Sequence, residues 1–216
     1  MEQNVSMKIN ELPSPTWNWL KVNETPIKWS NKIEPCEIAA EGDAVSTETE
    51  QLSDIETGAG READAIFATE NTAKYQILAD NAGQDKTVRL HISGKKDAHT
   101  AGCVEIVAKE NSTLTVVRDS RVAPDATKEE DSTAEASLAV RVKMKVESGA
   151  SVRLVQVQMP QEHETLLSDI GGNLIGEGAK VEYIQLFLGK GNLYSGCRMD
   201  LNGKESKFAT ETGYLG

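Results

Sequence analysis

An internal repeat is the feature of this sequence that most constrains the fold. Four segments share one pattern, in which Gly or Asn stands second and alternating apolar and polar residues follow. They are Glu110–Val117, Ser148–Val155, Glu177–Ile184 and Asn202–Ala209. Gly and Asn best tolerate a left-handed backbone, and the alternation is typical of strands with one buried face. The second positions, spaced by 38, 29 and 25 residues, are Asn111, Gly149, Gly178 and Gly203. Such spacing favours the coils of a β-solenoid.

The longest interval contains a segment whose composition is unlike that of a buried strand. Residues Asp119–Ala136 include Pro124 and the charged run Lys128–Asp131. This composition is typical of a solvated surface loop. Without that loop, the interval would have the length of an ordinary coil.

The alternation also predicts which residues face the core. We expect burial of Leu138, Val140, Val142, Met144, Val146, Val152, Leu154, Val181 and Tyr183. In two copies the apolar positions then shift by one, to Val155 and Val157 and to Ile184 and Leu186. We expect the inward face to switch there, at equivalent stacked corners. The prediction is an all-β parallel β-helix, and the alternative is a β-sandwich of turn-marked strands.

The chain divides into two parts. Residues 1–73 have no clear period, so we expect an irregular, partly helical N-terminal segment with a short helix at Arg61–Ala68. Residues 74–216 form the expected solenoid. Trp17, Trp19 and Trp29 anchor the N-terminal arm to the domain or, alternatively, form a recognition patch.

Charge and composition exclude several classes of function. A net charge of -11 argues against nucleic acid and anionic membranes as partners. The sequence has neither a secretion signal nor an apolar run of membrane-spanning length, so we expect a cytoplasmic, soluble protein. Three widely spaced cysteines, Cys36, Cys103 and Cys197, are expected to be reduced.

The sequence contains few candidates for catalysis or metal binding. Phosphate-binding loops, metalloprotease motifs and nucleophile elbows are missing, so we expect neither catalytic nor cofactor-binding residues. His163 between two Glu residues, Cys103 and Cys197 are the candidate metal ligands. Each has a plainer interpretation, as an exposed loop histidine or as small buried cysteines.

Several motifs resemble the SufB/SufD family of iron–sulfur cluster assembly. They are Gly189–Leu193, Met199–Ser206 and Gly213–Gly216, with the coils Val146–Ala150 and Gly176–Ala179 and the Pro-Thr-Trp lead within Leu12–Leu20. The resemblance is best over residues 74–216. Among family members, the chain is most similar to the short SufD-like ones. It departs from the family at Tyr194–Cys197, where members carry an Arg soon after the Gly-rich turn. Arg198 follows instead.

The resemblance implies a right-handed parallel β-helix that pairs with a SufB-like sister subunit. It also implies docking of a SufC-like ATPase through C-terminal helices. By this resemblance, the sequence stops at Gly216 within the family's solenoid, before its C-terminal helices. We therefore expect a C-terminally truncated member that lacks this docking region. Cluster or iron would be handled by the full complex, with no cofactor bound by this chain.

We therefore expect a non-catalytic scaffold subunit, with self-association into a homo-oligomer also possible. The alternatives are a polysaccharide-acting β-helix enzyme and an adhesive β-solenoid. An enzyme of that kind needs carboxylates clustered on one face. The equivalent outward positions instead hold Thr115, Arg153, Glu182 and Lys207.

Overall fold

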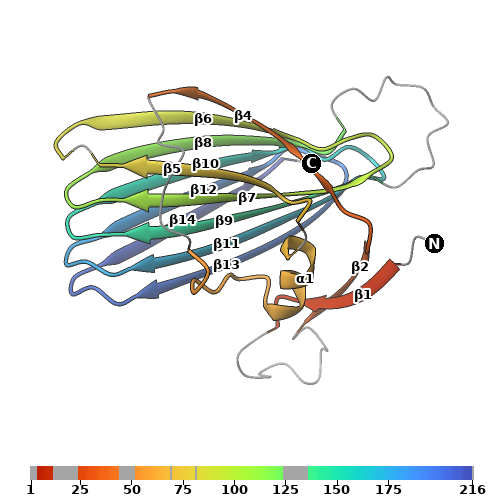
Figure 1. Ribbon diagram of the computed structural model, residues 1–216, viewed down its shortest axis with the longest axis horizontal. Coiled ribbons are helices and arrows are strands. Elements are labelled where there is room, and N and C mark those ends of the chain that lie inside the picture. Colours follow the sequence, from red (N-terminus) through yellow and green to blue (C-terminus); the bar gives the residue numbers. More distant parts are fainter. Residues whose placement is uncertain are drawn as a thin grey trace.

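The computed structural model describes residues 4–11, 24–43, 52–68, 70–80, 82–123 and 136–215, most of which form a parallel β-solenoid of about five turns (Figure 1). Successive strands alternate between two sheets. The even sheet contains β6 (Asp85–Ser93), β8 (Thr113–Arg121), β10 (Ser151–Gln158), β12 (Lys180–Phe187) and β14 (Lys207–Tyr214), with β4 (Glu37–Gly42) antiparallel to β6. The odd sheet contains β7 (His99–Ala108), β9 (Ser137–Val146), β11 (Thr165–Leu174) and β13 (Asn192–Leu201). Both β3 (Glu34–Pro35) and β5 (Ala73–Ala79) pair with β7.

The coils turn at residues with a left-handed backbone, two positions before each even-sheet strand from β6 to β14. These residues are Gly83, Asn111, Gly149, Gly178 and Glu205, with φ of 78°, 58°, 67°, 68° and 58°. The N–H of Asn111 donates to the carbonyl of Ser148 at 2.9 Å, and the N–H of Gly149 donates to that of Glu177 at 2.9 Å. The corners predicted at Asn111, Gly149 and Gly178 are thus stacked and hydrogen-bonded.

The fourth corner differs from its predicted position. Strand β12 pairs with β14 so that Lys180 lies beside Lys207, which makes Glu205 the equivalent of Gly178. Gly203 is instead the equivalent of Gly176, because a Cβ at Gly203 would collide with the backbone of Gly176. The predicted alignment was two residues out of register because Asn202-Gly203 has the same composition as a corner.

The core between the sheets confirms the residues predicted to be buried. All nine are at most 2% exposed, and they belong to one apolar cluster. They come from β9 of the odd sheet together with β10 and β12 of the even sheet. Stacked coils therefore bury a continuous core, as a solenoid requires.

The predicted switch of the inward face was wrong. In β10 the buried positions continue from Val152 and Leu154 to Gln156 and Gln158, and Val155 and Val157 lie on the outer side. In β12 the inward residue after Tyr183 is Gln185. Polar residues on this inward face hydrogen-bond to one another across coils and between the two sheets, which offsets part of the cost of burial.

The N-terminal segment contains a short helix where one was predicted, and also strands that were not. The 3₁₀ turn η1 (Arg61–Ala63) leads into α1 (Asp64–Phe67). Strands β1 (Asn4–Ile9) and β2 (Thr25–Ser30) form an antiparallel hairpin. Trp29 is 1% exposed in a cluster that includes Ala139 and Leu167 of the odd sheet, which confirms its anchoring role. Trp17 and Trp19 lie outside the described residues.

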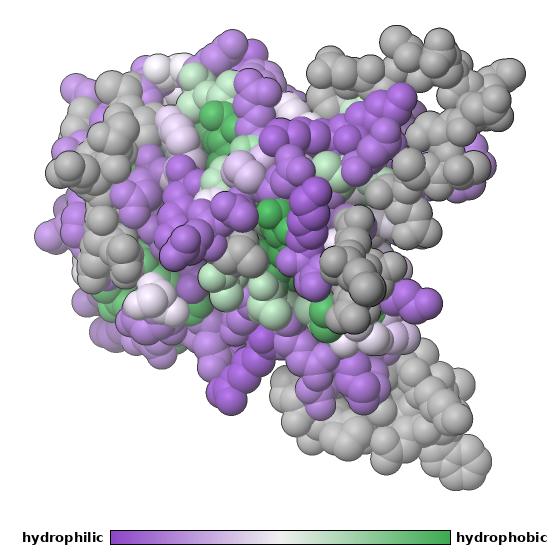
Figure 2. Space-filling view, turned by 45° about the vertical axis from the view of Figure 1, so that its right-hand side comes forward, coloured by the Kyte–Doolittle hydropathy of each residue, from purple (hydrophilic) through white to green (hydrophobic). Residues whose placement is uncertain are grey.

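The predicted surface loop is only partly described. Residues 119–121 complete β8, Ala136 directly precedes β9, and residues 124–135 lie outside the described part of the chain. The face in Figure 2 is largely hydrophilic with small hydrophobic patches, in keeping with the net charge of -11. In the described residues, neither helix is long and apolar enough to cross a membrane.

Candidate functional site

Polar side chains form a continuous group inside the solenoid, where a core of this kind is expected to be apolar. Arg118 on β8 lies beside Gln156 on β10, which lies beside Gln185 on β12. In the same orientation, Ser120 lies beside Gln158. Ser168 on β11 and Ser195 on β13 reach this group from the odd sheet. We call these seven residues, together with Tyr183, the inner polar group.

Arg118 is the charged member of this group. It is fully buried, and burial lowers the pKa of its guanidinium to about 10. Its Nη2 donates to Gln156 Oε1 and, at 3.1 Å, to Ser168 Oγ. The hydroxyl of Ser168 donates in turn to Gln156 Oε1 at 3.0 Å. Hydrogen bonds thus join the two sheets across the interior.

A second set of hydrogen bonds continues toward the last coils. Gln185 Nε2 donates to Gln158 Oε1 at 2.6 Å. The Oε1 of Gln185 accepts from Tyr183 Oη at 3.0 Å and from Ser195 Oγ at 3.2 Å. Burial raises the pKa of the Tyr183 phenol, so this hydroxyl is a neutral donor at neutral pH.

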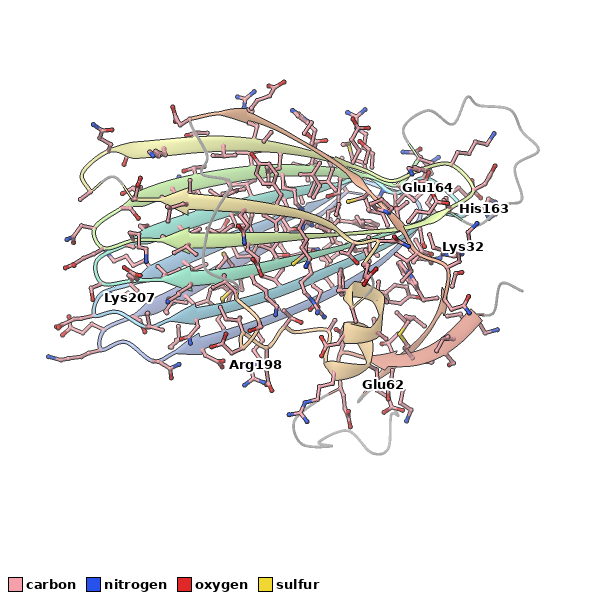
Figure 3. All side chains as sticks on the ribbon, in the orientation of Figure 1. Lys32, Glu62, His163, Glu164, Arg198 and Lys207 are labelled. Atoms are coloured by element: carbon pink, nitrogen blue, oxygen red, sulfur yellow. The ribbon has the colours of Figure 1, made fainter. Side chains whose placement is uncertain are left out.

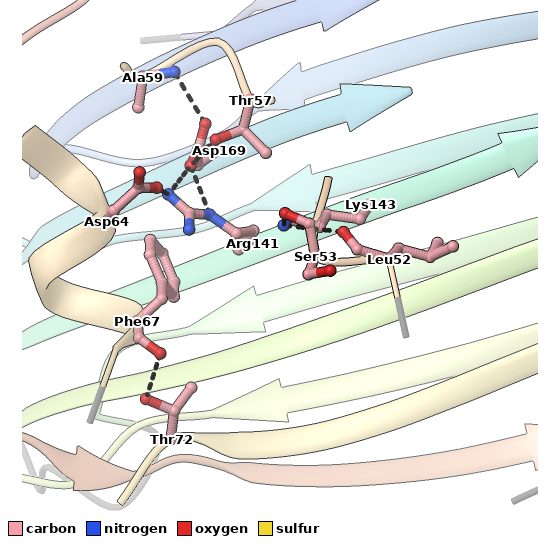
Figure 4. Close-up of polar contacts among 10 residues, drawn as sticks. All are labelled: Leu52, Ser53, Thr57, Ala59, Asp64, Phe67, Thr72, Arg141, Lys143 and Asp169. Carbon is pink, nitrogen blue, oxygen red and sulfur yellow. Dashed lines mark hydrogen bonds and ion pairs between the residues drawn. The ribbon is translucent and has the colours of Figure 1, made fainter. Parts of the chain in front are cut away.

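A separate buried ion pair lies on the outer face of the odd sheet (Figure 4). Asp169 on β11 is 0% exposed and lies 2.7 Å from Arg141 Nη2 and 2.8 Å from Arg141 Nε. Asp169 also accepts from Thr57 Oγ1 at 2.6 Å and from the N–H of Ala59 at 2.8 Å. The two contacts from Thr57 and Ala59 fasten residues 52–68, which we call the strap, to the solenoid.

Further contacts hold the strap over the sheet. Arg141 Nη2 lies 2.8 Å from Asp64 of α1, and its guanidinium carbon lies 4.1 Å from the centre of the Phe67 ring. Lys143 Nζ donates to the carbonyl of Leu52 at 2.9 Å. Gly196 on β13 leaves room for the strap, because a Cβ there would collide with the backbone at Gly58 and Ala59. The Arg141–Asp169 pair therefore has a positioning function.

The predicted metal candidates lie apart from one another. His163 is exposed in the turn after β10, with φ of 68°, at the opposite end of the strands from Lys207 (Figure 3). Cys103 on β7 shares an outward row with Arg141 and Asp169. Cys197 on β13 shares an inward row with Ile170 and Val142, and is exposed on the last described odd-sheet strand.

The chemistry of these groups does not favour a metal site. Burial is the main cause that raises the pKa of the half-buried Cys103 thiol to about 11, so this thiol is protonated at neutral pH. Next to His163, the largely buried Glu164 has a raised pKa because of burial. Among the described residues, no three His, Cys, Asp or Glu side chains gather into a potential metal site.

The inner polar group was not predicted from the sequence, because only apolar residues were expected on the inward face. A signal was nevertheless present. The pairs Val152 and Leu154, then Gln156 and Gln158, continue one strict alternation, and Gln185 recurs at the equivalent place of the next coil. Polar residues repeated at one coil position point to a ladder of side chains inside the solenoid.

Comparison with models of protein families gives a match. The family model described as SUF system FeS cluster assembly, SufBD core domain, matches residues 91–216. This range begins within β6 and continues through β14, and so includes the inner polar group. A search of curated proteins and a search of solved structures found no match.

Proposed function

The chain belongs to the SufB/SufD family of the SUF system, which assembles iron–sulfur clusters, and we propose that it is a non-catalytic, SufD-like scaffold subunit of that system. The observation that carries the proposal is the coincidence of the family match with the parallel coils, residues 91–216. Stacked coils with a continuous core make a rigid body with long lateral faces. Such a body suits a subunit that holds partners in place.

We expect the partners to be a SufB-like sister subunit and, through it, a SufC-like ATPase. SufB/SufD domains work in a complex with other subunits. In the described part of the chain, β13 and β14 each pair on one side, and exposed apolar residues lie at this edge. Leu201 is 50% exposed, Tyr214 is 74% exposed and Leu215 is 73% exposed. These two strands can accept a further strand, and a partner that covers the exposed apolar side chains would gain from burying them.

The outer face of the even sheet supports a scaffold rather than a polysaccharide-acting enzyme. The row of equivalent outward positions is Thr115, Arg153, Glu182 and Ala209, with Ala209 in place of the predicted Lys207 because of the corrected register. Arg153 and Glu182 form an ion pair. A lone carboxylate paired with Arg lacks the second carboxylate that glycoside hydrolysis requires.

The proposal includes the handling of iron or cluster by the full complex rather than by this chain alone. Anaerobic incubation of the purified chain with iron and sulfide should therefore give no stoichiometric cluster absorbance. The physical reason is that Cys36 is buried, Cys103 faces outward and Cys197 faces inward at the last described coils, whereas a cluster needs several converging thiolates. Absorbance and iron content per chain are the measurements.

Cysteine variants make this result decisive. A cluster chromophore that is lost in Cys103→Ser or Cys197→Ser, and kept in Cys36→Ser, would show that the accessible thiols bind a cluster in the chain itself. That outcome would contradict the assignment of a scaffold without its own cofactor. Absorbance that persists in all three variants would instead report iron sulfide bound without these ligands.

A further inference from the structure

Four members of the inner polar group form a square on the inner face of the even sheet. Arg118 and Ser120 lie two residues apart on β8, directly beside Gln156 and Gln158 on β10. Neighbouring corners are therefore about 4.8 Å apart across the strands and about 6.6 Å apart along them. All four residues are 0% exposed. They thus share one closed region between the two sheets.

This square contains donors without acceptors. Within the described residues, Nε and Nη1 of Arg118, Nε2 of Gln156, Nε2 of Gln158 and Oγ of Ser120 are buried without a hydrogen-bond partner. The two amide oxygens of the square are already engaged, since Gln156 Oε1 accepts from Arg118 and Ser168, and Gln158 Oε1 accepts from Gln185. So many unpaired buried donors at one place are rare in folded proteins, which indicates that an acceptor binds there.

Among the described residues, the charge of Arg118 also has no counter-charge. In the described part of the chain, the titratable groups that act on its guanidinium are the Tyr183 phenol and the Cys36 thiol. Burial raises the pKa of Cys36 to about 12 and also raises that of Tyr183, so both groups are neutral at neutral pH. Arg118 itself stays protonated. A buried guanidinium without an opposite charge is strongly unfavourable.

We propose that the square formed by Arg118, Ser120, Gln156 and Gln158 binds one small monovalent anion of halide size inside the solenoid. One negative charge balances the one guanidinium. A halide accepts hydrogen bonds from every side, which matches a site where the unpartnered groups are donors. Buried water could accept some of these bonds but would leave the positive charge uncompensated.

Thermal unfolding in different sodium salts tests this site. The chain is unfolded and refolded in sodium gluconate, whose anion is too large for the square, and is then moved to chloride or bromide at the same ionic strength and pH 7.5. We expect a saturable rise in Tm of about 5 °C or more in chloride and bromide, because the anion binds the folded state alone. A crystal grown in bromide should show an anomalous peak against the Arg118 guanidinium.

Two variants separate this site from general salt effects. Arg118→Met keeps the length of the side chain without its charge and should lose the difference between halide and gluconate. Arg153→Met, on the exposed outer face of the same sheet, should retain it. The proposal is wrong if wild type melts equally in gluconate and chloride and bromide crystals show only water in the square. It is also wrong if Arg118→Met keeps the halide effect. Should Arg118→Met fail to fold, the bromide peak in wild type decides.

Discussion

Val142→Asp is expected to lower the free energy of unfolding by more than about 4 kcal/mol, which is a large fraction of the total stability of a folded domain. Val142 is 1% exposed at the centre of β9, between Val104 on β7 and Ile170 on β11. These neighbours offer no hydrogen-bonding side chain to a carboxylate. An unpaired charge there keeps its full desolvation cost. Urea unfolding followed by circular dichroism measures the effect.

Val5→Asp is the matched control. Val5 is 46% exposed on β1, and the same substitution there should cost no more than about 1 kcal/mol. Equal midpoints for wild type and Val142→Asp would contradict the interior position of this residue and, with it, the stacking of β7, β9 and β11.

Asp169→Ala is expected to cost about 3–5 kcal/mol and to release the strap before the coils unfold. The substitution leaves the buried Arg141 without its main partner and removes the acceptor for Thr57 and for the Ala59 N–H. Hydrogen exchange should therefore accelerate across residues 52–68 while β8, β10 and β12 stay protected. Hydrogen exchange followed by mass spectrometry resolves the two regions.

Asp200→Ala tests whether the effect depends on burial. Asp200 lies on β13 of the same sheet and pairs with Arg198 at 3.3 Å, where both side chains are solvent-exposed. An exposed pair contributes little, so this variant should remain within about 1 kcal/mol of wild type. If the hydrogen-exchange rates of residues 52–68 are the same in Asp169→Ala and in wild type, the carboxylate does not fasten the strap.

The solenoid could be predicted from the sequence because its signals are local. Each corner needs a residue with a left-handed backbone, and Asn111, Gly149 and Gly178 are of the types that adopt one readily. The alternation of apolar and polar residues along a strand indicates which face is buried. The fourth corner was predicted at the wrong residue, because Glu205 adopts the left-handed backbone although Glu is not a typical turn residue. Stacking against the preceding coil, rather than the residue type, sets that position.

The inner polar group and the strap could not be predicted in the same way, because both depend on contacts between distant residues. Gln156 is acceptable inside only because Arg118 and Ser168 reach it, from positions 38 residues before it and 12 residues after it. Asp169 likewise is buried because the strap supplies Thr57, 112 residues earlier. The candidates His163, Cys103 and Cys197 were chosen by residue type, and the fold holds them apart.

Native mass spectrometry of the chain co-expressed with SufB-like and SufC-like proteins from the same source tests the proposed scaffold role most directly. We predict one assembly that contains all three proteins. Tyr214→Asp at the end of β14, combined with Leu215→Asp directly after it, should release the chain from this assembly, whereas Val5→Asp should not. A wild-type chain found only by itself, while the other two proteins assemble without it, would contradict the scaffold assignment.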